Sequence, residues 1–261
     1  MEYQTIDIGS GGKLATVTLN RPQVRNAFDE ATVAELTHAF ARLGQDPEVR
    51  VIVLAANGAA FCAGADLHWM RKMAAYSAAD NLQDATRLAQ MLRTIWECPK
   101  PVVARVQGDC YAGGMGLVAA CDIVVAAETV KFCLSEVKLG LIPATIAPYV
   151  IKAMGASAAR RCMVSAEVFD AAEASRIGFV HEVVDGAGLD ARVAAIVKTL
   201  LANSPQAMAA AKRLVREIDG QPVGDALVAD TAQRIAEIRA SNEGREGVAA
   251  FLEKRKPGWL A

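Results

Sequence analysis

The sequence predicts an α/β protein built from stacked ββα units and followed by a helical C-terminal region. Short segments rich in β-branched residues alternate with amphipathic helices in the first half of the chain, and each helix follows roughly two strands. That ratio favours ββα units over a plain doubly wound sheet. After Pro143 the pattern becomes almost wholly helical. We expect residues 1–195 to form the core with the candidate site, and residues 196–261 to form the helical region.

The first half contains four segments with strand composition, namely Lys13–Leu19, Val51–Ala55, Val102–Val106 and Asp122–Ala127. Two long helices are expected between them. Asp29 can cap the first helix, whose inward face would be Val33, Leu36, Phe40 and Leu43. The second should run from about Ala79 to Glu97 and end before Lys100-Pro101. Its helical spacing predicts the inward residues Leu82, Ala85, Leu88, Leu92 and Ile95.

The second half has helical spacing in six segments, with Gly178 and Pro205 as breaks. These segments are Ala156–Val164, Ala171–Arg176, Leu189–Ala202, Gln206–Ile218, Gly224–Ser241 and Gly244–Lys254. Many of their residues are alanine, which is the best helix former and leaves small, closely packing faces. Such faces suit contacts between subunits.

Composition excludes several classes of function. The 261 residues carry a formal net charge of -1, which gives no reason to expect a nucleic acid or a membrane surface as partner. No apolar run is long enough to span a bilayer, and Met1–Asp7 has no signal-peptide core, so we expect a soluble cytoplasmic protein. The six cysteines lack CxxC spacing and are expected to be buried thiols. The three histidines are too dispersed to predict a metal site.

Two loops share one design, in which small residues stand at a strand end just before a probable helix. They are Ala63-Gly64-Ala65-Asp66 and Tyr111-Ala112-Gly113-Gly114. Glycine in such a loop lets backbone N–H groups face outward, and the positive end of the helix dipole reinforces them. Two converging N–H groups can stabilise a carbonyl oxygen that gains negative charge, and one such donor is typically worth about 10²–10³ in rate.

A lone carboxylate follows the second loop. Glu136 is the only acidic residue between Glu128 and Glu167, and it stands in the mostly apolar run Phe132–Ile142. A carboxylate in apolar surroundings can act as a general acid or base. A surface glutamate beside a packed helix is the structural alternative.

These segments resemble the crotonase superfamily, the enoyl-CoA hydratases and isomerases. The resemblance lies in RPQVRNAFD (21–29), FCAGADL (61–67), AGGMGLVAACDIVVA (112–126), FCLSEVKLGLIP (132–143), FDAAEASRIGFV (169–180) and FLEKRKPGW (251–259). It implies a crotonase-like spiral of ββα units with a helical C-terminal trimerisation region. It also implies homotrimers or dimers of trimers, a coenzyme A thioester as substrate, and no permanently bound cofactor or metal.

By position, the resemblance makes Ala65 and Gly113 the two donors to the thioester oxygen and Glu136 the catalytic acid. Ala63 and Asp66 fall where the family's loop meets the adenine end of coenzyme A through main-chain atoms.

Further positions are expected to bind the substrate. Arg25 is a candidate phosphate contact, and His68, Gly114 and Gly116 are expected near the acyl group. Two C-terminal residues resemble the acyl-pocket wall and a phosphate contact, often supplied by a neighbouring subunit; they are Phe251 and Lys254.

The sequence departs from the family pattern at two places. Hydratases of this family typically have a second glutamate three residues after the second oxyanion glycine, where this chain has Gly116. The segment LIPATIAPYV (141–150) also replaces a glycine-rich segment. In the first interpretation the protein is a hydratase. Glu136 then both deprotonates the attacking water and returns a proton to the α-carbon, and Gly116 opens space for a branched or carboxylated acyl chain.

The substrate expectation comes from GMGLVAACDI, SEVKLGLIPA and the DLHWM loop, which look most like bacterial 3-methylglutaconyl-CoA and isohexenylglutaconyl-CoA hydratases. A second substrate carboxylate would then meet His68, Arg71 or Lys72. Two other interpretations stay open. One carboxylate is sufficient for an enoyl-CoA isomerase, and a chain that has lost an acid could be a non-catalytic acyl-CoA-binding protein.

Overall fold

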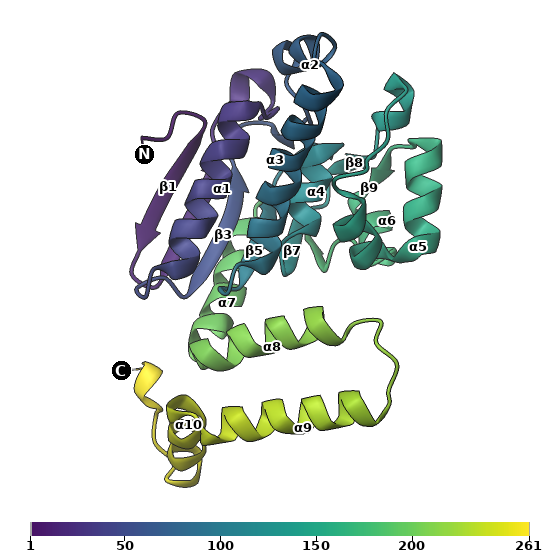
Figure 1. The fold of residues 1–261 in the computed structure, drawn as a ribbon. Coiled ribbons are helices and arrows are strands. Elements are labelled where there is room, and N and C mark those ends of the chain that lie inside the picture. Colours follow the sequence, from purple (N-terminus) through teal and green to yellow (C-terminus); the bar gives the residue numbers. More distant parts are fainter. Residues whose placement is uncertain (1, 261) are drawn as a thin grey trace.

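The computed structural model describes residues 2–260 and contains two β-sheets covered by helices (Figure 1). The larger sheet has the strand order β1-β2-β3-β5-β7-β10, and the smaller has the order β4-β6-β8-β9. The pairs β1–β2 and β8–β9 are antiparallel and the others are parallel. The strands are β1 (Ile6–Gly11), β2 (Leu14–Leu19), β3 (Val51–Ala56), β4 (Ala60–Cys62), β5 (Val102–Val106), β6 (Asp109–Tyr111), β7 (Ile123–Ala127), β8 (Lys131–Cys133), β9 (Phe169–Asp170) and β10 (Glu182–Val184).

Ten α-helices follow one another along the described residues. They are α1 (Glu30–Gln45), α2 (Leu67–Met73), α3 (Ala78–Glu97), α4 (Gly113–Ala119), α5 (Ala147–Ser165), α6 (Ala171–Arg176), α7 (Leu189–Ala202), α8 (Pro205–Ile218), α9 (Asp225–Ala240) and α10 (Asn242–Leu252). Short 3₁₀ helices are η1 (Pro22–Val24), η2 (Glu136–Leu139) and η3 (Gly258–Leu260). The expected cap of α1 is present, since the Asp29 side chain accepts a hydrogen bond from the Thr32 N–H.

The chain repeats one ββα unit three times. In each unit the first strand (β3, β5 or β7) joins the larger sheet and the second (β4, β6 or β8) joins the smaller one. One or more helices then lead the chain back toward the larger sheet. Successive units therefore place like strands side by side, and the chain advances as a spiral. The predicted fold class is confirmed. The sequence did not reveal the three-residue strands β4, β6 and β8, because they are too short for a period-2 pattern.

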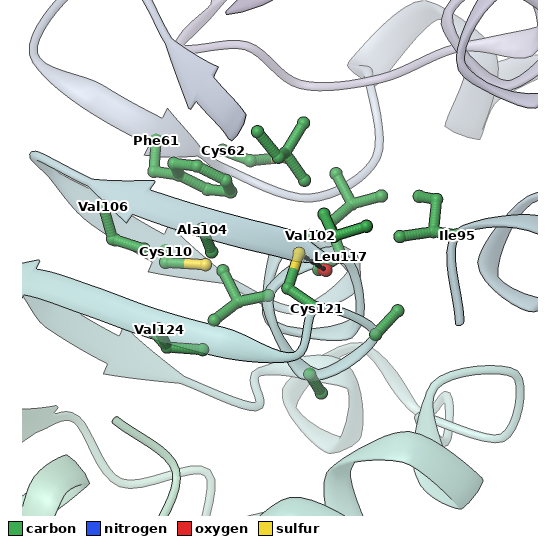
Figure 2. Close-up of a cluster of buried hydrophobic side chains, with 14 of the residues drawn as sticks. Phe61, Cys62, Ile95, Val102, Ala104, Val106, Cys110, Leu117, Cys121 and Val124 are labelled. Carbon is green, nitrogen blue, oxygen red and sulfur yellow. Dashed lines mark hydrogen bonds between the residues drawn. The ribbon is translucent and has the colours of Figure 1, made fainter. Parts of the chain in front are cut away.

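The core lies between the two sheets and the helices that cover them (Figure 2). Phe61 of β4, Val102 of β5 and Leu117 of α4 are fully buried in it. All six cysteines are buried free thiols, as expected. Burial raises the pKa of the Cys62 thiol to about 12, so the thiol is protonated and acts as small apolar filler.

Helix α3 is buried over only half of its length. Met91, Leu92 and Ile95 are buried, but Leu82 is 70% exposed and Ala85 is also exposed. The prediction that Leu82 and Ala85 face inward is therefore wrong. Their spacing places them on the correct stripe, but the first turns of α3 have no second layer to bury that stripe.

The C-terminal helices form an arm below the sheets in the view of Figure 1. Helix α7 packs against β3, β5 and β7, and its buried residues include Ile196 and Val197. The expected boundary at 195/196 thus cuts through α7, and the arm begins after Ala202. Helices α8 and α9 contain no buried residue. The chain itself therefore does not bury the faces of this arm. That they contact another subunit stays a prediction. Within residues 2–260 no helix is long and apolar enough to cross a membrane.

Candidate active site

Three parallel strands of the smaller sheet end at one edge, and each is followed by a loop that contributes to the site. Cys62 of β4 pairs with Cys110 of β6, and Tyr111 of β6 pairs with Cys133 of β8. The carboxyl ends of parallel strands meet at the same edge of a sheet, which is where ligands bind in open α/β sheets. Residues 63–66, 112–114 and 134–136 are therefore neighbours although the chain separates them widely.

The Ala65 N–H points away from Phe28, the residue whose backbone pairs with this loop. Ala65 forms a parallel bridge with Phe28. The Phe28 N–H donates to the Gly64 carbonyl at 2.9 Å, and the Asp66 N–H donates to the Phe28 carbonyl at 3.0 Å. In such a bridge the flanking residues make the hydrogen bonds, so the central residue turns its own N–H to the other side. No backbone acceptor within residues 2–260 takes the Ala65 N–H.

The Gly113 N–H is free for a different reason. Gly113 is the first residue of α4, and the first N–H groups of a helix have no acceptor within the helix. The preceding Ala112 has φ 48° and ψ −122°, a conformation that side-chain-bearing residues rarely adopt. Its own N–H donates to the Cys133 carbonyl at 2.8 Å. The sharp turn at Ala112 thus aims the Gly113 N–H outward while β8 holds the loop.

The two loops are in contact. A Cβ built on Gly64 would stand 3.0 Å from the Ala112 Cβ and 3.9 Å from the Gly113 nitrogen. Gly64 has φ 93°, where glycine is favoured, and it leaves just enough room for the second loop. The structure therefore brings the two loops into contact, and the roles of Ala65 and Gly113 as donors stay a prediction.

Glu136 begins η2, directly after β8 at the same sheet edge. The residue is half-buried, and its carboxylate oxygen Oε2 is fully shielded without a hydrogen-bond partner in residues 2–260. Burial disfavours the charged form and raises the pKa of this carboxyl. Buried polar atoms are nearly always paired, so an unpaired buried carboxylate oxygen at this sheet edge makes Glu136 a candidate functional residue.

Gly116 does not open space, which corrects the prediction. A Cβ on Gly116 would stand 2.2 Å from Ile146 Cγ2 and 2.8 Å from Ile146 Cβ, with Leu92 Cδ2 at 3.5 Å. Ile146 is 2% exposed. The side chain of Ile146 thus fills the place that a side chain at position 116 would take. The two departures from the family pattern, Gly116 and the segment 141–150, are parts of one packed contact.

Gly114 and Asp66 have structural roles, and their predicted contacts with substrate stay a prediction. A Cβ on Gly114 would stand 2.8 Å from both the Cβ and the carbonyl oxygen of Cys62, so Gly114 allows α4 to pack on β4. Asp66 is 4% exposed; its carboxylate pairs with Arg21 at 3.0 Å and accepts the His68 N–H at 2.8 Å. These partners hold the pKa of Asp66 below its usual value against the effect of burial. Since its N–H also bonds to Phe28, Asp66 fixes the loop.

The remaining predicted residues divide between two regions. Ala63, Arg25 and His68 are exposed near the loops, and the Arg25 carbonyl accepts the Ala63 N–H at 3.0 Å. By contrast, Phe251 and Lys254 lie at the end of α10, which packs on α8 and α9 far from the loops (Figure 1). Phe251 is 81% exposed. In one chain these two residues do not reach Glu136, and a role in a neighbouring subunit's site stays a prediction.

Comparisons with known proteins identify the family of the chain. The family described as "Enoyl-CoA hydratase/isomerase" matches residues 9–261. The chain is 34% identical to the mevalonyl-coenzyme A hydratase of Aspergillus fumigatus, over 93% of this chain and 90% of that protein. It is 31% identical to the crotonyl-CoA hydratase of Syntrophomonas wolfei over the whole of both. The crystal structure of an enoyl-CoA hydratase from Shewanella pealeana is 42% identical, with TM-score 0.96, covering 99% of this chain and 97% of that one.

The chain therefore belongs to the enoyl-CoA hydratase/isomerase family, and it is an enzyme. The predicted family resemblance is confirmed. The interpretation as a non-catalytic acyl-CoA-binding protein is not retained.

The contact between Gly116 and Ile146 gives a first testable prediction. Gly116→Ala should lower the free energy of unfolding by about 1–3 kcal/mol, because the new Cβ overlaps Ile146 in a packed core. Urea denaturation measures the loss. The control is Gly186→Ala, at an exposed position with no atom within 4 Å of the added Cβ, and should change stability by less than about 0.5 kcal/mol.

The contact also predicts non-additivity. Ile146→Gly removes the overlapping atoms, so the double variant should lose less stability than the sum of the two single losses. Additive losses would show that Gly116 and Ile146 do not share this space.

Proposed function

We propose that the protein adds water across the α,β double bond of an enoyl-CoA thioester, with Glu136 as the single acid–base group. The N–H groups of Ala65 and Gly113 would bind the thioester oxygen. The observation that carries the proposal is the unpaired, buried Glu136 Oε2 at the sheet edge where those two N–H groups are free. Hydratase activity on an enoyl-CoA is also what the related enzymes are named for.

The proposed reaction needs both the Glu136 carboxylate and the pair of N–H groups. Water attacks the β-carbon, the π electrons move toward the thioester, and the oxygen gains negative charge that two preorganised N–H groups stabilise. Glu136 accepts a proton from the attacking water as the new C–O bond forms. It then returns a proton to the α-carbon, so that one water molecule is added in total and the carboxylate is regenerated.

The packing around Gly116 supports a one-acid mechanism. Ile146 and Leu92 fill the space beside α4 in which a carboxylate side chain at position 116 would stand. Both side chains are apolar and buried, so they cannot hold or deprotonate water. Both proton transfers therefore fall to Glu136. The raised pKa of Glu136 suits this double role, because a group whose pKa lies nearer the working pH exchanges more readily between its ionised and protonated forms.

We further propose a branched, carboxylated acyl chain of the 3-methylglutaconyl type as substrate. Sequence identity alone does not select the acyl chain of the substrate, since the relatives named for mevalonyl-CoA and crotonyl-CoA are almost equally similar to this protein. Helix α2, which starts directly after the Ala65 loop, offers cations for a second carboxylate. Lys72 is already paired with Glu30 at 3.0 Å, whereas His68 and Arg71 are exposed and form no ion pair within residues 2–260.

Enoyl-CoA isomerisation is the second candidate function. The specific observation in its favour is the apolar wall at Ile146, which leaves one carboxylate to move a proton between the α- and γ-carbons and provides no second group for water. The family includes both reactions by its description.

A panel of enoyl-CoA esters tests the proposal. The purified enzyme should hydrate 3-methylglutaconyl-CoA with a higher kcat/KM than crotonyl-CoA, followed by loss of the ultraviolet absorbance of the conjugated thioester and by mass analysis of the product. A strong preference for crotonyl-CoA would overturn the substrate proposal. Conversion of a β,γ-enoyl ester to its α,β isomer without net addition of water would establish the isomerase instead.

Glu136→Gln should abolish turnover and leave binding of the CoA ester nearly unchanged. The amide keeps the size of the side chain but cannot accept the proton, and loss of general acid–base help costs about 10²–10⁴ in rate per role. The measurements are kcat and a Kd for the product ester. Glu128→Gln, the exposed acid nearest before Glu136 in sequence, is the control and should keep full activity. Substantial turnover by Glu136→Gln would contradict the assignment.

The raised pKa of Glu136 predicts an acid limb in the pH profile. The carboxylate must be ionised to accept a proton, so kcat/KM should fall as the pH drops through the pKa of Glu136. Because burial raises that pKa, the midpoint should lie above the ordinary 4.5. A midpoint at or below 4.5, in an enzyme shown to remain folded there by circular dichroism, would contradict this environment.

A further inference from the structure

We infer that Phe28 is the positioning residue that fixes the distance between the two N–H donors. This inference rests on the proposed function, because it assigns the residue that keeps the proposed thioester-binding groups in place. Phe28 contacts both the Ala65 loop and Gly113, the first through its backbone and the second through its ring. It does not touch the substrate in this role.

The backbone of Phe28 sets the direction of the Ala65 N–H. Its N–H and carbonyl bond to the residues on either side of Ala65, at 2.9 and 3.0 Å. These bonds make a single-residue parallel bridge outside the two sheets. The orientation of Ala65 therefore depends on where the backbone of Phe28 lies.

The ring of Phe28 sets the position of Gly113. A Cβ on Gly113 would stand 2.4 Å from Phe28 Cζ and 3.1 Å from Cε1, so the ring edge rests directly on this glycine. Phe28 is 1% exposed. The closed packing leaves Gly113 no room to move toward the ring without displacing it. The same residue that turns one donor outward thus packs directly against the other.

Neighbouring side chains hold Phe28 itself. The Trp69 ring lies 6.0 Å from the Phe28 ring, centroid to centroid, with an interplanar angle of 52°. Trp69 is 3% exposed, and its Nε1–H donates to Asp84 Oδ1 at 3.1 Å. On the other side, the Asn26 side chain donates to the Asn57 and Ala60 carbonyls at 2.7 and 2.9 Å. Phe28 is fixed from α2 and from the preceding turn, so it can transmit that rigidity to both donors.

The expected consequence is catalytic rather than structural. Hydrogen bonds weaken steeply with poor distance or angle, and each correctly placed donor to a developing oxyanion is worth about 10²–10³ in rate. A smaller apolar side chain at position 28 stays buried, but it leaves empty the space beside Gly113 that the ring edge fills. The donors can then relax while the loops that contact the rest of the CoA ester remain.

The test compares Phe28→Leu with Phe40→Leu. Phe40 is also 1% exposed, but it lies in α1, which packs on α3 and β1 rather than on the two loops. Both variants lose the same atoms from the core and should lower the melting temperature similarly. Only Phe28→Leu should lower kcat, by about 10-fold or more, with KM changed less than about 3-fold, since part of one donor's contribution is lost. If Phe28→Leu fails to fold, Phe28→Met takes its place, because the unbranched methionine side chain adapts to irregular core space.

A spectroscopic readout separates the two proposals. The probe is a cinnamoyl-CoA ester with a para-dimethylamino group, whose absorption moves to longer wavelength when its thioester oxygen is polarised. The wild-type protein and Phe40→Leu should show the full shift, and Phe28→Leu a reduced one at saturating probe. No shift in the wild type, with binding demonstrated, would overturn the proposed donors themselves. A full shift and equal kcat losses in the two variants would overturn only the role of Phe28.

Discussion

The register of three short parallel strands is the constraint on which the site depends. Cys62 pairs with Cys110 and Tyr111 with Cys133, so three loops distant in sequence leave one sheet edge together. The hydrogen bond from the Ala112 N–H to the Cys133 carbonyl extends that register into the loops. A shift of one residue would reverse the faces of the strands and separate Gly113 from Glu136. The larger sheet and its helices hold this register by burying the opposite side.

The site contains unfavourable local features that the surrounding fold stabilises. Ala112 has a positive φ, and Glu136 has a buried oxygen that finds no partner among residues 2–260. Each costs free energy in isolation. Both lie where the proposed reaction needs an outward N–H group or a carboxylate with a raised pKa, while Asp66 and Gly114 satisfy ordinary capping and packing requirements beside them. Strain and unsatisfied polarity thus occur at groups with a proposed chemical role.

The contact between Gly116 and Ile146 shows how one packing choice can shape a reaction. An isoleucine side chain from the start of α5 occupies the space that a side chain on α4 would need. In the proposed mechanism, this packing leaves Glu136 as the group that transfers protons. The same arrangement suits water addition by a single carboxylate and proton transfer along an acyl chain, which are reactions of one family.

The sequence by itself determined the ββα order, the two glycine-containing loops and the isolated Glu136, because these depend on local composition and spacing. Tertiary structure alone decided which neighbours meet. Leu82 lies on the apolar stripe of α3, but no other described element covers it. The space beside Gly116 is filled by Ile146, thirty positions away, and the Asp66 carboxylate is already paired with Arg21 and with the cap of α2. Periodicity states which face of an element is apolar. Whether that face, or a gap beside a glycine, is filled depends on side chains brought from elsewhere in the chain.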